Sequence, residues 1–94
     1  MHYVYILHSE KINMFYIGYT SDINTRLEFH NKAAPQKFTY NADDWKLVFS
    51  FECETKLQAL AAEKHIKKMK SKIYILHLIK YPKMISSLKD KYKP

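Results

Sequence analysis

Two apolar stretches near the start of the chain constrain its fold more than any other feature. Residues 2–8 (HYVYILH) and 14–19 (MFYIGY) alternate aromatic or branched side chains, and the polar residues SEKIN lie between them. Alternation with a period of two is typical of β-strands, and a short polar connection is typical of an antiparallel pair. The chain is therefore expected to begin with a β-hairpin.

The hairpin would bring two tyrosines and the only glycine onto one face. A loop centred on residues 10 and 11 pairs positions whose numbers sum to 21, so Tyr5 is expected to face Tyr16 directly. Gly18 would lie on the same face and leave an opening that no side chain fills. Such a glycine often marks close approach of a ligand. A β-bulge at Gly18 and simple cross-strand packing of the tyrosines are the alternatives.

The next segment predicts a helix that carries two polar residues on one stripe. Residues 20–32 (TSDINTRLEFHNK) offer Thr20 or Ser21 as the N-cap. Arg26, the only arginine of the chain, and His30 are four residues apart and are therefore neighbours on the helix surface.

The middle of the chain predicts a loop, a third strand and a second helix. Residues 33–44 have loop composition, and residues 44–52 (DWKLVFSFE) have a strand pattern. Residues 55–70 begin with a capping box from Thr55 to Gln58. The inward face of this helix is expected to carry Ala59, Ala62, Ile66 and Met69. Glu63 borders that face and is the only acid between Thr55 and Lys89.

The last third predicts a short helix followed by a tail. Residues 71–80 are expected to form a helix that Ser71 caps, and Pro82 is expected to end it. Residues 83–94 are interpreted as a short basic tail. With 94 residues and 47% hydrophobic content, the chain is long enough for one compact domain, here expected over residues 1–82.

Composition also bounds where the protein works. Cys53 is the only cysteine, so it has no partner for an internal disulfide, and a reducing compartment is expected. No apolar run approaches the roughly 18 residues of a membrane span, and the first residues lack a signal-peptide pattern. We therefore expect a cytoplasmic protein without a membrane partner.

The charge of the chain is concentrated in its second half. Residues 1–54 carry five Lys or Arg and seven acids, a net charge of −2, whereas residues 55–94 carry eleven Lys and two acids, a net charge of +9. This asymmetry predicts a polyanionic partner, most simply nucleic acid. The candidate contacts are Lys64, Lys67, Lys68, Lys70 and Lys72. A solvated lysine surface is the alternative.

Taken in order, these features resemble the GIY-YIG nuclease superfamily. The two motifs that name the family correspond to Tyr3-Val4-Tyr5 and Tyr16-Ile17-Gly18, and the helical R-x-x-x-H pattern and a later acid follow at Arg26, His30 and Glu63. In size the chain is most similar to the small single-domain bacterial branch, which is related to the nuclease domain of the excision-repair protein UvrC.

The resemblance implies an α+β fold, with a three-stranded antiparallel sheet flanked by about three helices. It also implies a metal-dependent DNA endonuclease with one divalent ion, Mg²⁺ or Mn²⁺, in a setting of DNA repair or recombination. The implied catalytic residues are Tyr5, Tyr16, Arg26, His30 and Glu63. Gly18 would admit the nucleic-acid backbone.

Each implied role suits the chemistry of its residue. Arg26 would hold two phosphate oxygens, because a guanidinium binds them in pairs. Glu63 would hold the metal ion. Tyr5 would take a proton from water if Arg26 and the metal ion lowered its pKa. Tyr16 would orient phosphate or water, and His30 would hydrogen-bond Tyr16 or the substrate.

Two departures from the family pattern leave alternatives open. Tyr3 replaces the first glycine of the motif, and no asparagine follows Glu63. A binding module without catalysis is therefore one alternative, and an adaptor whose basic half docks an acidic protein is another. Glu63 could also form an ordinary ion pair with Lys67, or a structural salt bridge with Arg26.

Overall fold

The computed structural model describes residues 1–31 and 42–94. These residues form an antiparallel sheet of three strands, in the order β2-β1-β3, together with four helices. The elements in chain order are β1 (His2–Ser9), β2 (Met14–Thr20), α1 (Ile23–Asn31), β3 (Lys46–Cys53), α2 (Lys56–Met69), α3 (Lys72–Lys80) and α4 (Pro82–Lys91). The expected α+β class and sheet are confirmed.

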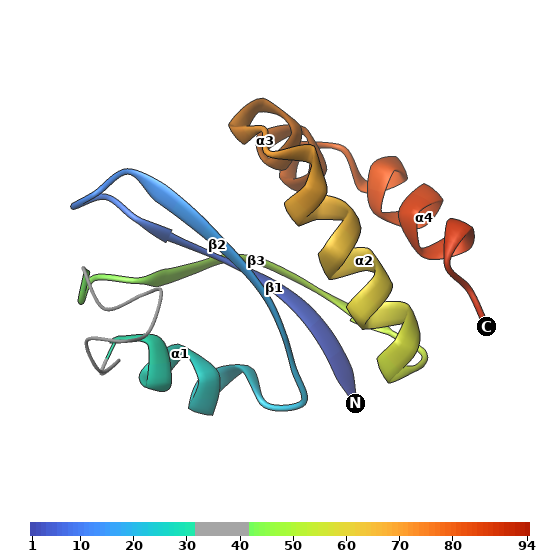
Figure 1. The fold of residues 1–94 in the computed structure, drawn as a ribbon, viewed down its shortest axis with the longest axis horizontal. Helices are drawn as coiled ribbons and strands as arrows, with labels where there is room; N and C mark the ends of the chain where they lie inside the picture. Colours follow the sequence, from blue (N-terminus) through green and yellow to red (C-terminus); the bar gives the residue numbers. More distant parts are fainter. Residues whose placement is uncertain (32–41) are drawn as a thin grey trace.

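The sheet separates two layers of helices (Figure 1). Alternation along β1 explains the separation, because Val4 and Ile6 pack into the core beneath α2, whereas Tyr5 and Leu7 enter a smaller cluster with Trp45 on the face that α1 covers. Helix α1 thus lies on one face of the sheet, and α2, α3 and α4 lie on the other. Strand β2 forms one edge.

The pairing of β1 with β2 differs from the expected register by two residues. Paired positions sum to 23, so Tyr5 lies opposite Gly18, and Tyr16 lies opposite Leu7. The predicted Tyr5–Tyr16 pairing is therefore wrong. Both tyrosines nevertheless share one face, because a shift of two residues preserves the alternation of side chains.

Helix α1 begins one residue later than its predicted caps allow. The carboxylate of Asp22 accepts hydrogen bonds from the backbone N and side-chain hydroxyl of Thr25, at 3.2 and 2.9 Å. Asp22 is therefore the N-cap, and Thr20 instead bonds the backbone of Asp22 through its hydroxyl. The expected caps at Thr20 or Ser21 are wrong.

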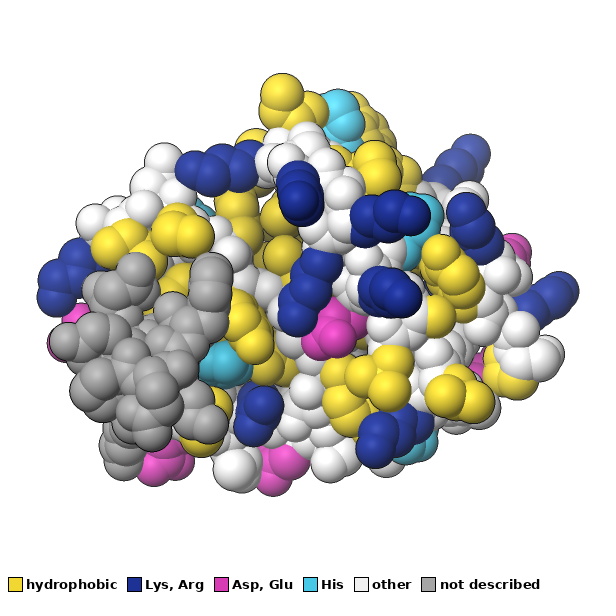
Figure 2. Space-filling view, viewed as in Figure 1, with side chains coloured by type: hydrophobic (Ala, Val, Ile, Leu, Met, Phe, Trp, Pro, Cys, Tyr) yellow, Lys and Arg dark blue, Asp and Glu magenta, His cyan; other side chains and the backbone are white. Residues whose placement is uncertain are grey.

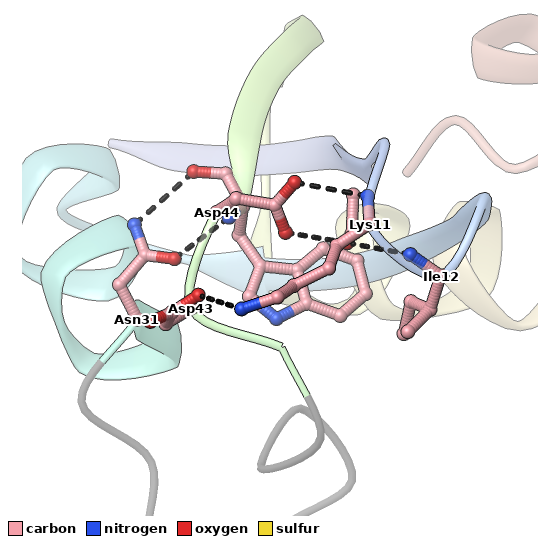
Figure 3. Close-up of polar contacts among 7 residues, drawn as sticks. Lys11, Ile12, Asn31, Asp43 and Asp44 are labelled. Carbon is pink, nitrogen blue, oxygen red and sulfur yellow. Dashed lines mark hydrogen bonds and ion pairs between the residues drawn. The ribbon is translucent and has the colours of Figure 1, made fainter.

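Polar contacts join the residues just before β3 to the end of α1 and to the hairpin turn (Figure 3). The Asn31 side chain donates to the Trp45 carbonyl at 3.1 Å and accepts from the Trp45 backbone N at 2.8 Å. Asp44 accepts from the Ser9 hydroxyl at 2.5 Å and from the Lys11 backbone N at 3.1 Å. These contacts fix the segment before β3 against α1 on one side and against the hairpin turn on the other. The predicted loop over residues 33–44 lies mostly outside the described residues.

Helix α2 packs on the sheet much as its pattern predicts. Thr55 caps it by accepting from the Gln58 backbone N at 3.1 Å, although the Gln58 side chain bonds Glu54 and Lys89 rather than completing a capping box. Ala59, Ala62 and Ile66 are buried as expected. Met69 is 46% exposed, so its predicted inward position is wrong. It is the last residue of the helix and lines an open depression toward the end of α4.

The final two helices complete the main core. Helix α3 forms as predicted, with Ser71 accepting from the Tyr74 backbone N at 3.1 Å. The segment expected to be a basic tail is instead α4, which begins at Pro82 and buries Leu88 in the main core. Proline favours a helix start because it lacks only an N–H that would be unpaired there. Within the described residues, no helix is long and apolar enough to cross a lipid bilayer.

Candidate active site

Tyr5 and His30 form the buried centre of the candidate site. Tyr5 lies in β1 and is 1% exposed, and His30 lies in the last turn of α1 and is 3% exposed. A hydrogen bond of 2.7 Å joins the Tyr5 hydroxyl to His30 Nε2. Two residues separated by 25 positions are thus held in direct contact by the docking of α1 on the sheet.

Burial sets the protonation states of this pair. Desolvation raises the pKa of Tyr5 to about 12, although Arg26 acts in the opposite direction. Desolvation, assisted by the charge of Arg26, lowers the pKa of His30 to about 4. Near neutral pH the phenol is therefore protonated and the imidazole is neutral. Arg26 by itself does not bring the Tyr5 pKa below its ordinary value, because the cost of burying a phenolate exceeds the effect of the cation. The lowering expected from Arg26 together with a metal ion stays a prediction.

The space beside Gly18 is filled by the Tyr5 ring. A Cβ atom at Gly18 would lie 2.5 Å from Cζ and 2.9 Å from Cε1 of Tyr5. The expected opening that no side chain fills is therefore absent at this point. Glycine is required here because Tyr5 crosses over its backbone, which is a close approach within the protein. Approach of nucleic acid to Gly18 stays a prediction.

Gly18→Ala should lower the free energy of unfolding by about 1 to 3 kcal/mol, because the new methyl group overlaps the Tyr5 ring. Urea unfolding would measure the cost. In a Tyr5→Val background, where the ring is absent, the same substitution should cost much less. Equal costs in the two backgrounds would show that the ring contact is not the cause.

Tyr16 lines the same site from the edge strand. Its ring centroid lies 4.5 Å from that of His30 and 6.4 Å from that of Tyr5. Burial and the negative charge of Glu63 raise the pKa of Tyr16, so its hydroxyl keeps its proton near neutral pH. The Tyr16 hydroxyl can therefore donate a hydrogen bond to an anionic ligand. His30 Nε2 bonds the Tyr5 hydroxyl, and the hydrogen bond expected from His30 to Tyr16 or substrate stays a prediction.

Arg26 supplies the positive charge of the site. Its Cζ atom lies 4.7 Å from the centroid of the Phe29 ring, and its charge acts on Tyr5, Tyr16 and His30. Its Nε atom is buried and has no hydrogen-bond partner among the described residues. An unsatisfied buried donor on a guanidinium marks a position where an anionic ligand could bind.

Glu63 approaches the tyrosines from the other layer. Its carboxylate is 3.8 Å from Lys67 Nζ and its side chain is 18% exposed, and Lys67 Nζ lies 5.5 Å from the centroid of the Tyr16 ring. The expected Glu63–Lys67 pair is present, and no ion pair joins Arg26 to Glu63 within the described residues. The charge of Glu63 also acts on both tyrosines. The five predicted residues therefore meet around the edge strand β2.

A comparison with known families covers the part of the chain that carries these residues. The family model of the GIY-YIG catalytic domain matches residues 1–75, which contain both tyrosines, the α1 pair and Glu63. The chain belongs to the GIY-YIG family. The family is one of nucleases, and the candidate site described above lies within the matched residues.

Two bacterial GIY-YIG relatives illustrate the match. The UPF0213 protein YazA of Bacillus subtilis is 34% identical over 77 residues, which cover 79% of this chain and 77% of YazA. A UPF0213 protein of Staphylococcus aureus is 38% identical over 66 residues, which cover 70% of this chain and 79% of the relative. No solved structure matches the chain.

The lysines predicted as nucleic-acid contacts of this GIY-YIG domain lie on two sides of α2. Lys67 lies beside Tyr16 and Glu63, whereas Lys64 and Lys68 line a depression toward the end of α4. Lys70 ends α2 in a left-handed conformation, and Lys72 donates to the Asn13 carbonyl in the hairpin turn at 2.8 Å. Figure 2 shows an acidic side chain among basic ones over α2.

Three residues around the site escaped the sequence analysis. Phe29 lies under Arg26, Trp45 packs against Tyr16 at 6.4 Å between centroids, and Asn31 holds the backbone of Trp45. Trp45 is the only tryptophan of the chain, which is a weak indication that it belongs to the site. The other two follow no spacing rule, because their partners are defined by the docking of α1 on the sheet.

His30 should make the stability of the domain depend on pH. The unfolded chain binds a proton at His30 below about pH 6.5, but the folded protein does so only below about 4. The free energy of unfolding should therefore fall as the pH falls from 6.5 to 4, by at most about 3 kcal/mol. Urea unfolding across this range should show a weaker pH dependence for His30→Gln. An identical dependence in both proteins would contradict the assigned pKa.

Proposed function

We propose that this protein is a metal-dependent endonuclease that hydrolyses phosphodiester bonds in DNA. The observation that carries the proposal is the buried hydrogen bond between Tyr5 and His30 beside an unpartnered guanidinium nitrogen of Arg26. A proton acceptor next to an anion-binding group is what water attack on a phosphodiester requires. The family match over residues 1–75 supports a nuclease.

Tyr5 and His30 would act together as the base. Tyr5 carries a proton near neutral pH, so its oxygen can take a proton from water only if it releases its own. His30 Nε2, 2.7 Å away and neutral, is positioned to receive that proton. The water oxygen then forms a bond to phosphorus, one phosphorus–oxygen ester bond breaks, and the leaving oxygen is protonated from solvent.

Phosphate binding would prepare His30 for this role. The charge of Arg26 contributes to the low pKa of His30. A phosphodiester bound to the guanidinium would offset that charge, so the pKa of His30 should rise when substrate binds. The Tyr16 hydroxyl, protonated beside Glu63, would donate a hydrogen bond to the phosphate or the water. Substrate binding and proton acceptance are thus coupled through Arg26.

Glu63 is the residue that would hold a divalent ion. Among the described residues, no three His, Cys, Asp or Glu side chains gather into a metal site. Mg²⁺ often binds proteins through one or two carboxylates and retains water, so a single partly exposed carboxylate beside the site fits this ion or Mn²⁺. When bound, the ion would supply positive charge for the developing oxyanions.

The DNA would lie across the edge strand β2. An open depression of about 410 Å³ adjoins the site and is lined by Phe15, Tyr16, Ile17 and Lys67. Its aromatic and basic side chains suit a nucleotide. Lys64, Lys67, Lys68, Lys70 and Lys72 remain the proposed contacts to the phosphate backbone. We assign the activity to DNA repair or recombination in the cytoplasm, on the strength of the resemblance to the UvrC-related branch.

A cleavage assay tests the proposal directly. Labelled duplex, branched and single-stranded DNA would be incubated with the protein, with Mg²⁺, with Mn²⁺ or with chelator. We expect cleavage of at least one substrate only when a divalent ion is present. Salt-sensitive binding without any cleavage would favour a binding module instead, and binding to acidic protein but not to DNA would favour an adaptor.

A further inference from the structure

The helical layer carries a second basic surface, on a side of α2 different from that of Glu63. Two depressions, of about 590 and 320 Å³, lie along α2 and α4 and share His65 and Lys91. The first also contains Lys64, Lys68 and Tyr92, and the second contains Lys83. We refer to these six residues as the α2–α4 groove. No Asp or Glu side chain lines either depression.

Contacts between the two helices define the shape of this groove. His65 Nδ1 and the Tyr92 hydroxyl are 3.0 Å apart, and their ring centroids are separated by 5.8 Å. This contact holds the end of α4 against the middle of α2. The charges of Lys91 and Lys68 both contribute to a lowered pKa of His65, although burial is the larger cause. Cations from both helices therefore act on His65, which lines both depressions.

The lysines of the groove are available for an external partner. Lys64, Lys68, Lys83 and Lys91 are exposed, and none forms an ion pair with a carboxylate in the part of the chain that the structure describes. Like charges held close together repel one another, so an arrangement of unpaired lysines around a hollow favours binding of an extended anion. The partly buried Tyr92 ring, with the Lys91 Nζ atom 5.8 Å from its centroid, adds an amphipathic wall.

We propose that the α2–α4 groove binds the phosphodiester backbone of a nucleic acid at a point separate from the catalytic site. The inference rests on the proposed function, because the substrate of a nuclease is the anion that reaches both surfaces. It goes beyond the predicted lysines by assigning α4 as the second wall. Lys67 at the active site and Lys64 and Lys68 in the groove lie on adjacent sides of α2, so one nucleic acid crossing that helix would contact both.

The test compares two triple variants that lose the same charge. The groove variant is Lys64→Gln, Lys68→Gln, Lys91→Gln, and the control variant is Lys46→Gln, Lys56→Gln, Lys80→Gln, whose exposed lysines lie on β3, α2 and α3 outside the groove. Fluorescence anisotropy in chelator would measure binding to duplexes of about 10 and about 20 base pairs, one and two helical turns. The salt concentration would be varied for each combination of protein and duplex.

Each lost phosphate contact should change the slope of log affinity against log salt by about 0.9. For the longer duplex we expect the groove variant to lose about 2 to 3 from the magnitude of that slope, and the control variant to lose less than about 1. Equal losses in the two variants would overturn the proposal. Unchanged DNA binding together with weaker binding of polyglutamate would overturn it too, in favour of an acidic protein partner.

Cleavage by the native chain separates this inference from the proposed function. If the native chain cleaves DNA and the groove variant shows unchanged slopes of log affinity against log salt, the proposed nuclease function is supported and the proposed role of the groove is overturned. If the native chain never cleaves and the slope decreases only in the groove variant, the proposed role of the groove is supported and the proposed nuclease function is overturned. Circular dichroism would verify that each variant is folded. If the triple groove variant unfolds, the double variant Lys64→Gln, Lys68→Gln would replace it, with an expected loss of about 2 from the magnitude of the slope.

Discussion

Exchanging Arg26 for lysine is expected to lower kcat/KM for DNA cleavage by about 10²- to 10³-fold while the fold is retained. The substitution keeps the positive charge but removes the planar pair of donors that can bind two phosphate oxygens at once. It also removes the buried Nε that has no partner among the described residues. Single-turnover cleavage of a labelled substrate would measure the loss.

Two controls separate the geometry of Arg26 from its charge and from stability. Arg26→Gln removes the charge as well and should reduce cleavage further, whereas the urea midpoint of Arg26→Lys should remain near that of the native protein. The side chain is only partly buried and has no ion pair with Glu63 in the described structure, so a large loss of stability is not expected. Native activity in Arg26→Lys would refute the assigned role.

Replacing Glu63 by glutamine should abolish metal-dependent cleavage, with a loss of at least about 10³-fold, because a bound ion contributes several kcal/mol to transition-state stabilisation. The amide retains the shape of the side chain but not the charge that attracts a divalent cation. Calorimetric titration with Mn²⁺ should show weaker binding in parallel with the loss of cleavage.

Lys67→Gln is the matched control for this substitution. It breaks the same 3.8 Å ion pair but leaves the carboxylate in place, so it should retain Mn²⁺ binding. Partly exposed pairs of this kind contribute at most about 1 kcal/mol, so neither variant should unfold. A Glu63→Gln protein that still cleaves with Mg²⁺ would assign the metal to other residues.

The sequence predicted the membership of the site better than its internal geometry. Tyr5, Tyr16, Arg26, His30 and Glu63 do come together, because strand alternation and helical spacing are local rules that a compact fold preserves. The hairpin register was wrong because the turn extends over residues 10–13, with Asn13 at a φ of 49°, so the pairing is shifted by two residues. The shift changed the partner of Tyr5 without changing its face.

The errors at the carboxyl end have a different cause. Met69 follows the apolar spacing of α2, but it is the last residue of the helix and lines an open depression toward α4, so it is half exposed. Residues 83–94 contain only a few apolar side chains among lysines, which gives a weak local pattern. Leu88 becomes buried only because α2 and α3 provide a surface for it.

What the sequence alone determined was therefore the family, the order of the strands and first three helices along the chain, and the residue types available for chemistry. Only the tertiary structure decided that Tyr5 fills the space over Gly18, that His30 bonds Tyr5, and that the lysines of α2 divide between the site and the α2–α4 groove. The physical reason is the range of the forces involved. Alternation and capping depend on neighbours in the chain, whereas desolvation and charge at a buried site depend on residues that only folding brings together.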